Sequence, residues 1–127
     1  MEAKKKILIV DDDSFLLDMY SLKFAKYNFE ISTALGPEQA LEKLRSGLVP
    51  DIILLDVVMP IMDGFELMEK MKEESLAPEA IRIILSNRGQ PSDIARGNSL
   101  GAAGYIVKAS STPSEVIEKV NSILNNK

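Results

Sequence analysis

The chain has 127 residues, a formal net charge of −4, and neither cysteine nor histidine. This length is typical of one domain, and a chain of this size can bury a core without disulfides. The absence of the two residue types excludes a histidine base, a histidine-ligated metal and thiolate chemistry. Any reaction must therefore use carboxylates, hydroxyls, lysine or backbone groups.

The charge and hydropathy patterns exclude two classes of partner. Fifteen basic residues are scattered along the chain, and the only basic run is residues 4–6, which argues against nucleic-acid binding by this domain. No apolar run approaches the roughly 20 residues that span a bilayer. The apolar run at residues 7–10 is cut off by three aspartates, so no signal peptide is predicted. We expect one soluble cytoplasmic domain over residues 1–127.

Short apolar runs alternate with amphipathic segments along the chain. Strands are predicted at residues 7–10, 30–34, 52–55, 81–85 and 104–107, and near-continuous apolar strands suit a parallel sheet covered on both faces. Helices are predicted in the intervening segments, at residues 14–27, 37–45, 64–74, 91–100 and 113–125. This alternation predicts an α/β fold with a doubly wound sheet. The expected strand order is the flavodoxin-like 2-1-3-4-5.

Polar residues follow the apolar strands at their carboxyl ends. They are Asp11, Asp12 and Asp13 after the first strand, Asp56 after the third, Ser86 after the fourth and Lys108 after the fifth. In such a sheet ligands bind beyond the carboxyl ends, at the point between strands 1 and 3 where the winding reverses. Crowded carboxylates repel one another and recruit a hard cation such as Mg²⁺, so the pattern predicts a pocket for a phosphoryl group on a carboxylate.

Four motifs in order carry a resemblance that covers essentially the whole chain. They are Val10-Asp11-Asp12, then Leu55-Asp56-Val57-Val58-Met59-Pro60 with Met62-Asp63-Gly64, then Ile84-Leu85-Ser86-Asn87, and finally Gly104-Tyr105-Ile106-Val107-Lys108. The sequence resembles the response regulator receiver family of two-component signalling. The resemblance implies a phosphoacceptor that is charged by a histidine kinase or a histidine phosphotransfer protein. It also implies a signalling domain rather than an enzyme.

The resemblance implies a role for individual residues. Asp56 matches the phosphoacceptor, Asp12 the direct metal ligand, Asp11 the acid that holds the metal through water, and the backbone carbonyl of Val58 the third protein ligand. The expected metal is Mg²⁺, with Mn²⁺ as an alternative. Lys108 matches the counter-charge of the phosphoryl group.

The switch residues are also implied by the resemblance. Ser86 matches the hydroxyl that moves toward the phosphoryl oxygen, and Tyr105 the aromatic residue that turns inward on activation. The face formed by the fourth helix, fifth strand and fifth helix is then expected to meet a downstream protein. The chain departs from the family pattern at Ala109, where proline after a cis bond is common, and at Ser86, where threonine is commoner.

Two other functions are alternatives to a receiver. A Mg²⁺-dependent phosphohydrolase with an aspartyl-phosphate intermediate usually carries Asp-x-Asp and a cap domain, whereas Val58 stands two residues after Asp56. A degenerate receiver that only binds protein would lack an acid or Lys108, and none is lost. The sequence further favours a stand-alone receiver, because the charges that pair receivers of DNA-binding regulators are not evident at residues 102–104.

Three local features have structural interpretations. Asp13 is predicted to cap a helix, Asp63 to shape its turn or cap the next helix, and Thr112 to form a capping box with Glu115. Residues 91–100 contain Gly97-Asn98-Ser99, all poor helix formers. We therefore expect the fourth helix to be a low-stability element that phosphorylation can bias.

Overall fold

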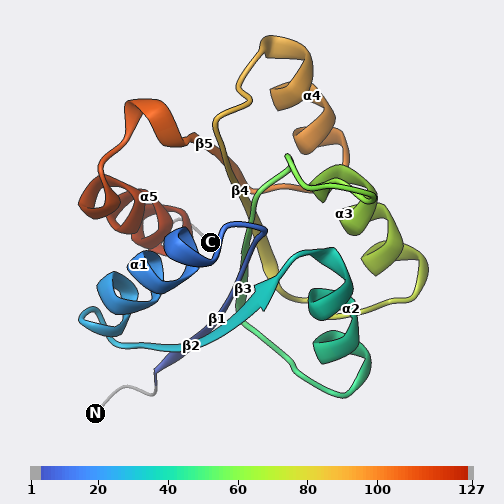
Figure 1. Ribbon diagram of the computed structural model, residues 1–127, viewed down its shortest axis with the longest axis horizontal. Coiled ribbons are helices and arrows are strands. Elements are labelled where there is room, and N and C mark those ends of the chain that lie inside the picture. The colour runs from blue at the N-terminus through green and yellow to red at the C-terminus, as the bar shows by residue number, and fades with distance from the viewer. Residues whose placement is uncertain (1–3, 126–127) are drawn as a thin grey trace.

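The computed structural model describes residues 4–125 and contains one parallel sheet of the predicted order, β2-β1-β3-β4-β5 (Figure 1). The strands are β1 (Lys5–Asp11), β2 (Phe29–Leu35), β3 (Ile52–Leu55), β4 (Ile81–Ser86) and β5 (Gly104–Val107). Every neighbouring pair is parallel. The predicted fold class is therefore confirmed, and β1 and β2 each extend one or two residues beyond the predicted apolar runs.

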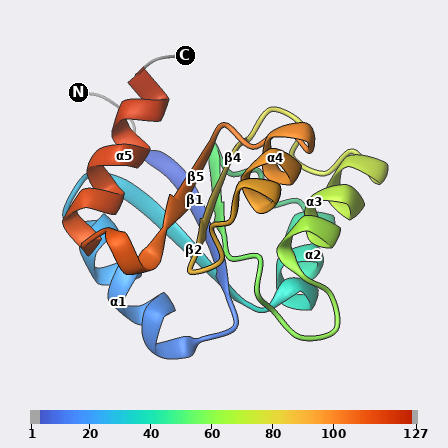
Figure 2. The same cartoon turned by 90° about the horizontal axis from the view of Figure 1, so that it is seen from above.

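Helices cover both faces of the sheet. They are α1 (Ser14–Ala25), α2 (Pro37–Arg45), α3 (Gly64–Glu73), α4 (Pro91–Ser99) and α5 (Pro113–Asn125), with a short 3₁₀ helix η1 (Lys108–Ser110) after β5. Viewed from above, α1 and α5 lie on one side of the sheet, and α2, α3 and α4 on the other (Figure 2). In the described part of the chain, no helix has the length and hydropathy needed to cross a membrane.

The period of two along the strands divides the core into two apolar layers. Ile7, Ile9, Ile52 and Leu54 pack with α1 and α5, while Leu8, Val10, Ile53 and Leu55 pack with α2 and α3. All eight side chains are buried on a sheet whose two faces are both covered. The continuous apolar runs of the sequence thus reflect burial on both faces.

Side-chain caps begin three of the helices as predicted. The carboxylate of Asp13 accepts hydrogen bonds from the N–H groups of the next helical turn, and Asp63 forms a reciprocal capping box with Glu66. Thr112 and Glu115 form the same arrangement before α5. Because caps fix where each helix leaves its loop, they also fix the loops at the carboxyl ends of the strands.

The glycine of α4 has a packing reason that the sequence did not reveal. A Cβ at Gly97 would lie 2.8 Å from Ile84 Cδ1 and 3.4 Å from Tyr105 Cδ2. The helix therefore approaches β4 and β5 closely where the glycine stands, although glycine weakens a helix by about 1 kcal/mol relative to alanine. The expected softness of α4 stays a prediction.

Arg82 braces the loop that joins α3 to β4 at the amino-terminal edge of the sheet. Ser75 and Ala77 in this loop have positive φ angles of 53° and 43°, which are unfavourable for residues with a Cβ. The Arg82 guanidinium donates to the carbonyl oxygens of Leu76 at 3.2 Å and Ala80 at 3.0 Å. Burial lowers the pKa of Arg82 below its ordinary value, but an arginine remains charged at neutral pH.

Replacing this guanidinium should destabilise the fold. Arg82→Met keeps the aliphatic stem but leaves both carbonyls without their donor, so we expect a loss of about 1–2 kcal/mol in the free energy of unfolding. Urea denaturation measures it. Lys72→Met, which removes an exposed cation nearby, is the matched control and should change stability by less than about 0.5 kcal/mol. Equal midpoints for the two variants would contradict the bracing role.

Candidate functional site

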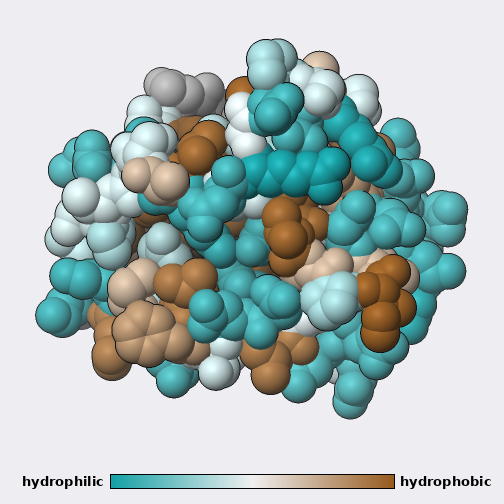
Figure 3. Space-filling model, turned by 45° about the horizontal axis from the view of Figure 1, so that its top comes forward, coloured by the Kyte–Doolittle hydropathy of each residue, from teal (hydrophilic) through white to brown (hydrophobic). Residues whose placement is uncertain are grey.

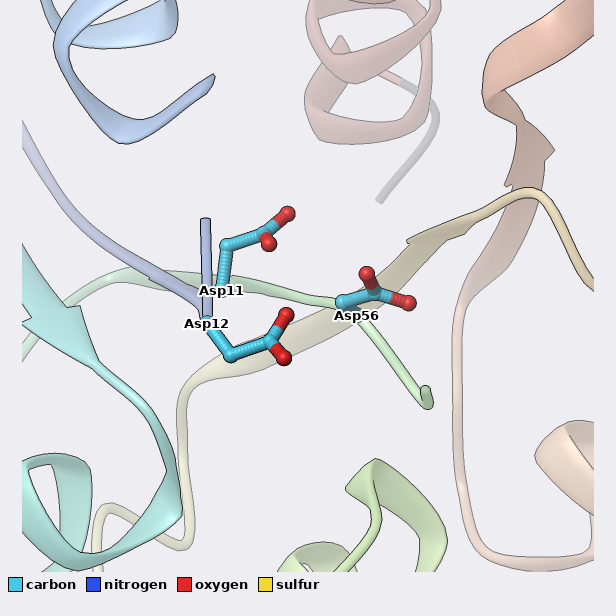
Figure 4. A group of neighbouring side chains, drawn as sticks. All are labelled: Asp11, Asp12 and Asp56. Atoms are coloured by element: carbon cyan, nitrogen blue, oxygen red, sulfur yellow. The ribbon is translucent and has the colours of Figure 1, made fainter. Parts of the chain in front are cut away.

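Three carboxylates meet at the carboxyl ends of β1 and β3. Asp11 is the last residue of β1, Asp12 follows it, and Asp56 follows β3, which pairs directly with β1. One carboxylate oxygen from each lies within 4.8 Å of the other two. Figure 4 shows the three side chains pointing into one space from the two strands. Asp11 and Asp56 are only 4% and 6% exposed, whereas Asp12 is exposed.

Lys108 reaches this cluster from the end of β5. Its Nζ donates to Asp11 Oδ2 at 2.7 Å and to Asp56 Oδ2 at 2.9 Å. Burial alone would lower the pKa of Lys108, but the hydrogen bonds to the two carboxylates outweigh it and raise the pKa above its ordinary value. Burial raises the pKa of Asp11, and Lys108 only partly offsets this rise. The ammonium therefore stays protonated and partly neutralises the cluster.

Backbone groups fix the orientation of the two buried acids. Asp11 Oδ1 accepts from the Asp13 N–H at 3.0 Å, and Asp56 Oδ1 accepts from the Val58 N–H at 3.0 Å. Each carboxylate thus has one oxygen that accepts a hydrogen bond from a backbone N–H and a second oxygen that accepts from Lys108. This arrangement holds both groups before any ligand binds, which is the kind of preorganisation that catalytic sites use.

Gly64 lets α3 begin directly behind Asp56. A Cβ at this position would lie 2.2 Å from the backbone oxygen of Asp56, a distance that no side chain tolerates. The Gly64 N–H also donates to the Val57 carbonyl at 3.1 Å. The glycine of the Asp63-Gly64 pair is therefore required by close backbone approach beside the acid cluster.

Ser86 and Tyr105 both contact the backbone of Arg88, in the loop between β4 and α4. The fully buried Ser86 Oγ accepts from the Arg88 N–H at 3.2 Å, and the Tyr105 hydroxyl donates to the Arg88 carbonyl. Sequence reasoning selected the serine and the tyrosine but not the residue between them. No local pattern in the sequence predicts the hydrogen bond between Tyr105 and the Arg88 carbonyl.

Asp93 ties the same loop to the start of α4. It is buried, with one oxygen 2.9 Å from Arg88 Nε and the other 3.1 Å from the Gln90 backbone nitrogen. Sequence reasoning missed Asp93, although its place three residues after Gln90 matches a capping pattern.

The Phe65 ring, at the start of α3, lies beside two arginines. The guanidinium of Arg88 is 6.0 Å from its ring centre and that of Arg96 is 4.7 Å away.

The structure defines the local geometry at Val58 and at the Lys108–Ala109 peptide bond. The Val58 side chain is 53% exposed, while its N–H is held by Asp56. Among residues 4–125 there is no cis peptide bond, so the Lys108–Ala109 bond is trans and the chain passes into η1. Alanine in place of proline is thus compatible with Lys108 reaching the acids.

The donor set defines what the site can bind. Three carboxylates offer only oxygen ligands, the class that Mg²⁺ and other hard cations take. The Asp56 carboxylate is held beside a protonated lysine, and the lysine can stabilise negative charge brought to it. The arrangement therefore suits transfer of an anionic group to Asp56.

The comparisons with known proteins agree with this geometry. The profile of the response regulator receiver domain matches residues 7–121. The chain is 32% identical over 120 residues to the alkaline phosphatase synthesis transcriptional regulatory protein PhoP of Bacillus subtilis, covering 94% of this chain and 48% of that protein. It is 35% identical over 129 residues to a protein-glutamate methylesterase/protein-glutamine glutaminase of Halalkalibacterium halodurans, covering 100% and 37% respectively.

A solved structure matches over nearly its full length. Chemotaxis protein CheY4 of Vibrio cholerae superimposes with a TM-score of 0.86 at 28% identity, covering 95% of this chain and 99% of that one. The chain spans about half the length of the transcriptional regulators that it matches. The profile match over most of its length, together with these relatives, shows that the chain belongs to the response regulator receiver domain family of two-component systems.

Proposed function

We propose that Asp56 accepts a phosphoryl group from a phosphohistidine of a histidine kinase or a histidine phosphotransfer protein. The observation that carries the proposal is the pair of hydrogen bonds from Lys108 to Asp11 and Asp56, which sets a positive charge beside a preoriented carboxylate. The family membership supports it, because receiver domains are the signalling units of two-component systems.

The transfer itself needs no further protein nucleophile. A carboxylate oxygen of Asp56 bonds to phosphorus as the P–N bond of the donor breaks, and the donor imidazole keeps the electron pair of that bond. The negative charge on the transferred oxygens is met by the Lys108 ammonium. The product is an aspartyl phosphate on the domain itself, so the domain acts as an acceptor in signalling and turns over no separate substrate.

A divalent cation fits the same site. We propose that Asp11, Asp12, Asp56 and the backbone carbonyl of Val58 hold Mg²⁺, or Mn²⁺ in its place. The close oxygens of the three acids support this, since their mutual repulsion is only partly relieved by one ammonium. When bound, the cation would supply positive charge that neutralises the phosphoryl oxygens.

The switch would act through the backbone of Arg88. A phosphoryl oxygen on Asp56 offers Ser86 a charge-assisted hydrogen bond that competes with its present partner, the Arg88 N–H. Because the Arg88 carbonyl accepts from Tyr105, and the Arg88 side chain pairs with Asp93, a moved Arg88 would shift both β5 and the start of α4. We propose that the face of α4, β5 and α5 changes conformation in this way and that a downstream protein binds the changed face.

Asp56 should be the only efficient acceptor. Incubation with acetyl phosphate and Mg²⁺ should add one phosphoryl group, about 80 Da by intact mass. Asp56→Asn should abolish the added mass. Asp13→Asn is the matched control, because asparagine caps a helix as well as aspartate does and the mutated side chain lies outside the cluster. Undiminished labelling of Asp56→Asn would refute the assignment.

Mg²⁺ should stabilise the unphosphorylated domain. At a roughly five-fold excess over Kd we expect about 1 kcal/mol of added stability, seen as a rise in the thermal midpoint. Asp12→Ala should abolish the rise. Lys108→Met should enlarge it, because no ammonium then competes for Asp11 and Asp56. A rise that is the same in wild type and Asp12→Ala would contradict a metal site here.

Removing the Ser86 hydroxyl should separate phosphorylation from the conformational response. We expect Ser86→Ala to bind beryllofluoride at Asp56 yet to lose most of the amide shift changes over residues 88–105, because the differential hydrogen bond is gone. Two-dimensional NMR measures the shifts. Ser46→Ala, at the end of α2, is the control and should respond as wild type does. A full response in Ser86→Ala would exclude this hydroxyl as the link.

A further inference from the structure

Two arginines cover the aromatic ring that begins α3. The Phe65 side chain is completely buried, although its ring lies directly beneath charged groups. The guanidinium carbon of Arg96, in α4, is 4.7 Å from the ring centre, and that of Arg88, in the loop before α4, is 6.0 Å away. A guanidinium at this distance is attracted to the negative face of the ring. Hydrophilic side chains accordingly gather over α3 and α4, at the upper right of Figure 3.

Arg96 also contacts a carboxylate of the same helix. Its Nη2 lies 3.3 Å from Glu69 Oε1, and both side chains are about half exposed. Glu69 lies one helical turn after Phe65, so the carboxylate and the ring are on the same face of α3. An ion pair between exposed groups stabilises little, whereas a guanidinium over a buried ring is partly shielded from water. The stack on Phe65 is therefore the stronger link between α4 and α3.

Phe65 belongs to the part of the domain that is fixed beside the acids. A Cβ at Gly64, the residue before it, would lie 2.2 Å from the Asp56 backbone oxygen, so the two backbones are in close contact. The Asp63 carboxylate caps the same turn by accepting from the Glu66 N–H at 2.8 Å. Close packing and the cap together hold the Phe65 ring in one place next to the site.

Arg96 belongs to the helix that the proposed switch would move. Arg88 donates its N–H to Ser86, and its side chain pairs with Asp93 in the first turn of α4. Asp93 and Arg96 are three residues apart, so they lie on the same face of α4 and shift together. A displacement that begins at Ser86 would therefore move Arg96 relative to the Phe65 ring.

We propose that the stack of Arg96 on Phe65 is an autoinhibitory contact, which holds α4 against α3 while Asp56 is unphosphorylated. The inference rests on the proposed function, because it requires that phosphorylation of Asp56 moves α4. A contact made in only one of two conformations stabilises that conformation, so this stack opposes activation. Ser86 would drive the change, and Arg96 would set how much free energy the change requires.

A second arginine that contacts α3 offers a matched control. Arg45, in α2, donates its Nε to Glu74 at 2.8 Å, at the end of α3, and its side chain is 48% exposed against 45% for Arg96. Within residues 4–125 it has no aromatic partner, and α2 takes no part in the proposed switch. Arg45→Gln therefore removes an ion pair between helices without removing a stack.

Four single variants separate the stack from the ion pair. Arg96→Gln removes both contacts, Glu69→Gln removes only the ion pair, and Phe65→Leu keeps an apolar side chain without an aromatic face. Arg45→Gln is the control. Each protein is titrated with beryllofluoride in the presence of Mg²⁺, and two-dimensional NMR follows the backbone amides of α4.

Arg96→Gln should bind beryllofluoride roughly fivefold more tightly than wild type, which corresponds to about 1 kcal/mol. Without beryllofluoride, its α4 amides should lie partway between the free and bound wild-type positions, a change that destabilisation alone does not produce. Phe65→Leu should tighten binding to the same degree, and adding Arg96→Gln to it should have no further effect. Glu69→Gln and Arg45→Gln should bind within about twofold of wild type.

The possible outcomes separate the stack from the function on which it rests. Binding by Arg96→Gln at the wild-type affinity or more weakly would show that the stack does not oppose activation. Equal tightening in Arg96→Gln and Glu69→Gln would assign the effect to the ion pair and overturn the role of Phe65. If wild type does not respond to beryllofluoride, or if Asp56→Asn responds as wild type does, the proposed function itself is wrong.

Discussion

The ion pairs of Lys108 with Asp11 and Asp56 are the contacts on which the site depends. Lys108 crosses from the end of β5 to acids on β1 and β3, so one ammonium joins three strands. Burying two carboxylates without a cation between them would destabilise the fold, because moving a charge out of water costs free energy. One ammonium for three nearby acids nevertheless leaves the cluster negative, and this residual charge is what a divalent cation can relieve.

The sheet supplies the rigid frame for these charges. Parallel pairing brings the carboxyl ends of β1 and β3 side by side, and two apolar layers hold the strands from both faces. Close backbone approach at Gly64 then fixes α3 against the Asp56 peptide. The packed layers thus place the polar atoms of the site on rigid elements, which is how precise sites are built.

Conformational strain and polar bridging are concentrated in the loops. Arg82 satisfies carbonyls in a loop with two positive φ angles at the amino-terminal edge of the sheet. At the opposite edge, the Arg88 N–H donates to Ser86, the Arg88 carbonyl accepts from Tyr105, and the Arg88 side chain pairs with Asp93. Bridges of this kind couple neighbouring elements through few hydrogen bonds, so a changed partner at one end can move the other. Ile61 differs, because its positive φ angle is combined with a side chain that is 96% exposed, so packing does not offset the strain.

The sequence by itself determined the element order and the carboxyl-end positions of Asp11, Asp12, Asp56, Ser86 and Lys108. It could do so because buried parallel strands read as continuous apolar runs and caps are local patterns. Only the tertiary structure decided that Lys108 contacts both Asp11 and Asp56, that Gly97 packs on Ile84, and that Arg88 lies between Ser86 and Tyr105. These contacts join residues far apart in the chain or depend on individual backbone angles. Hydropathy period and residue type do not encode such distances, which are fixed only when the strands and helices pack together.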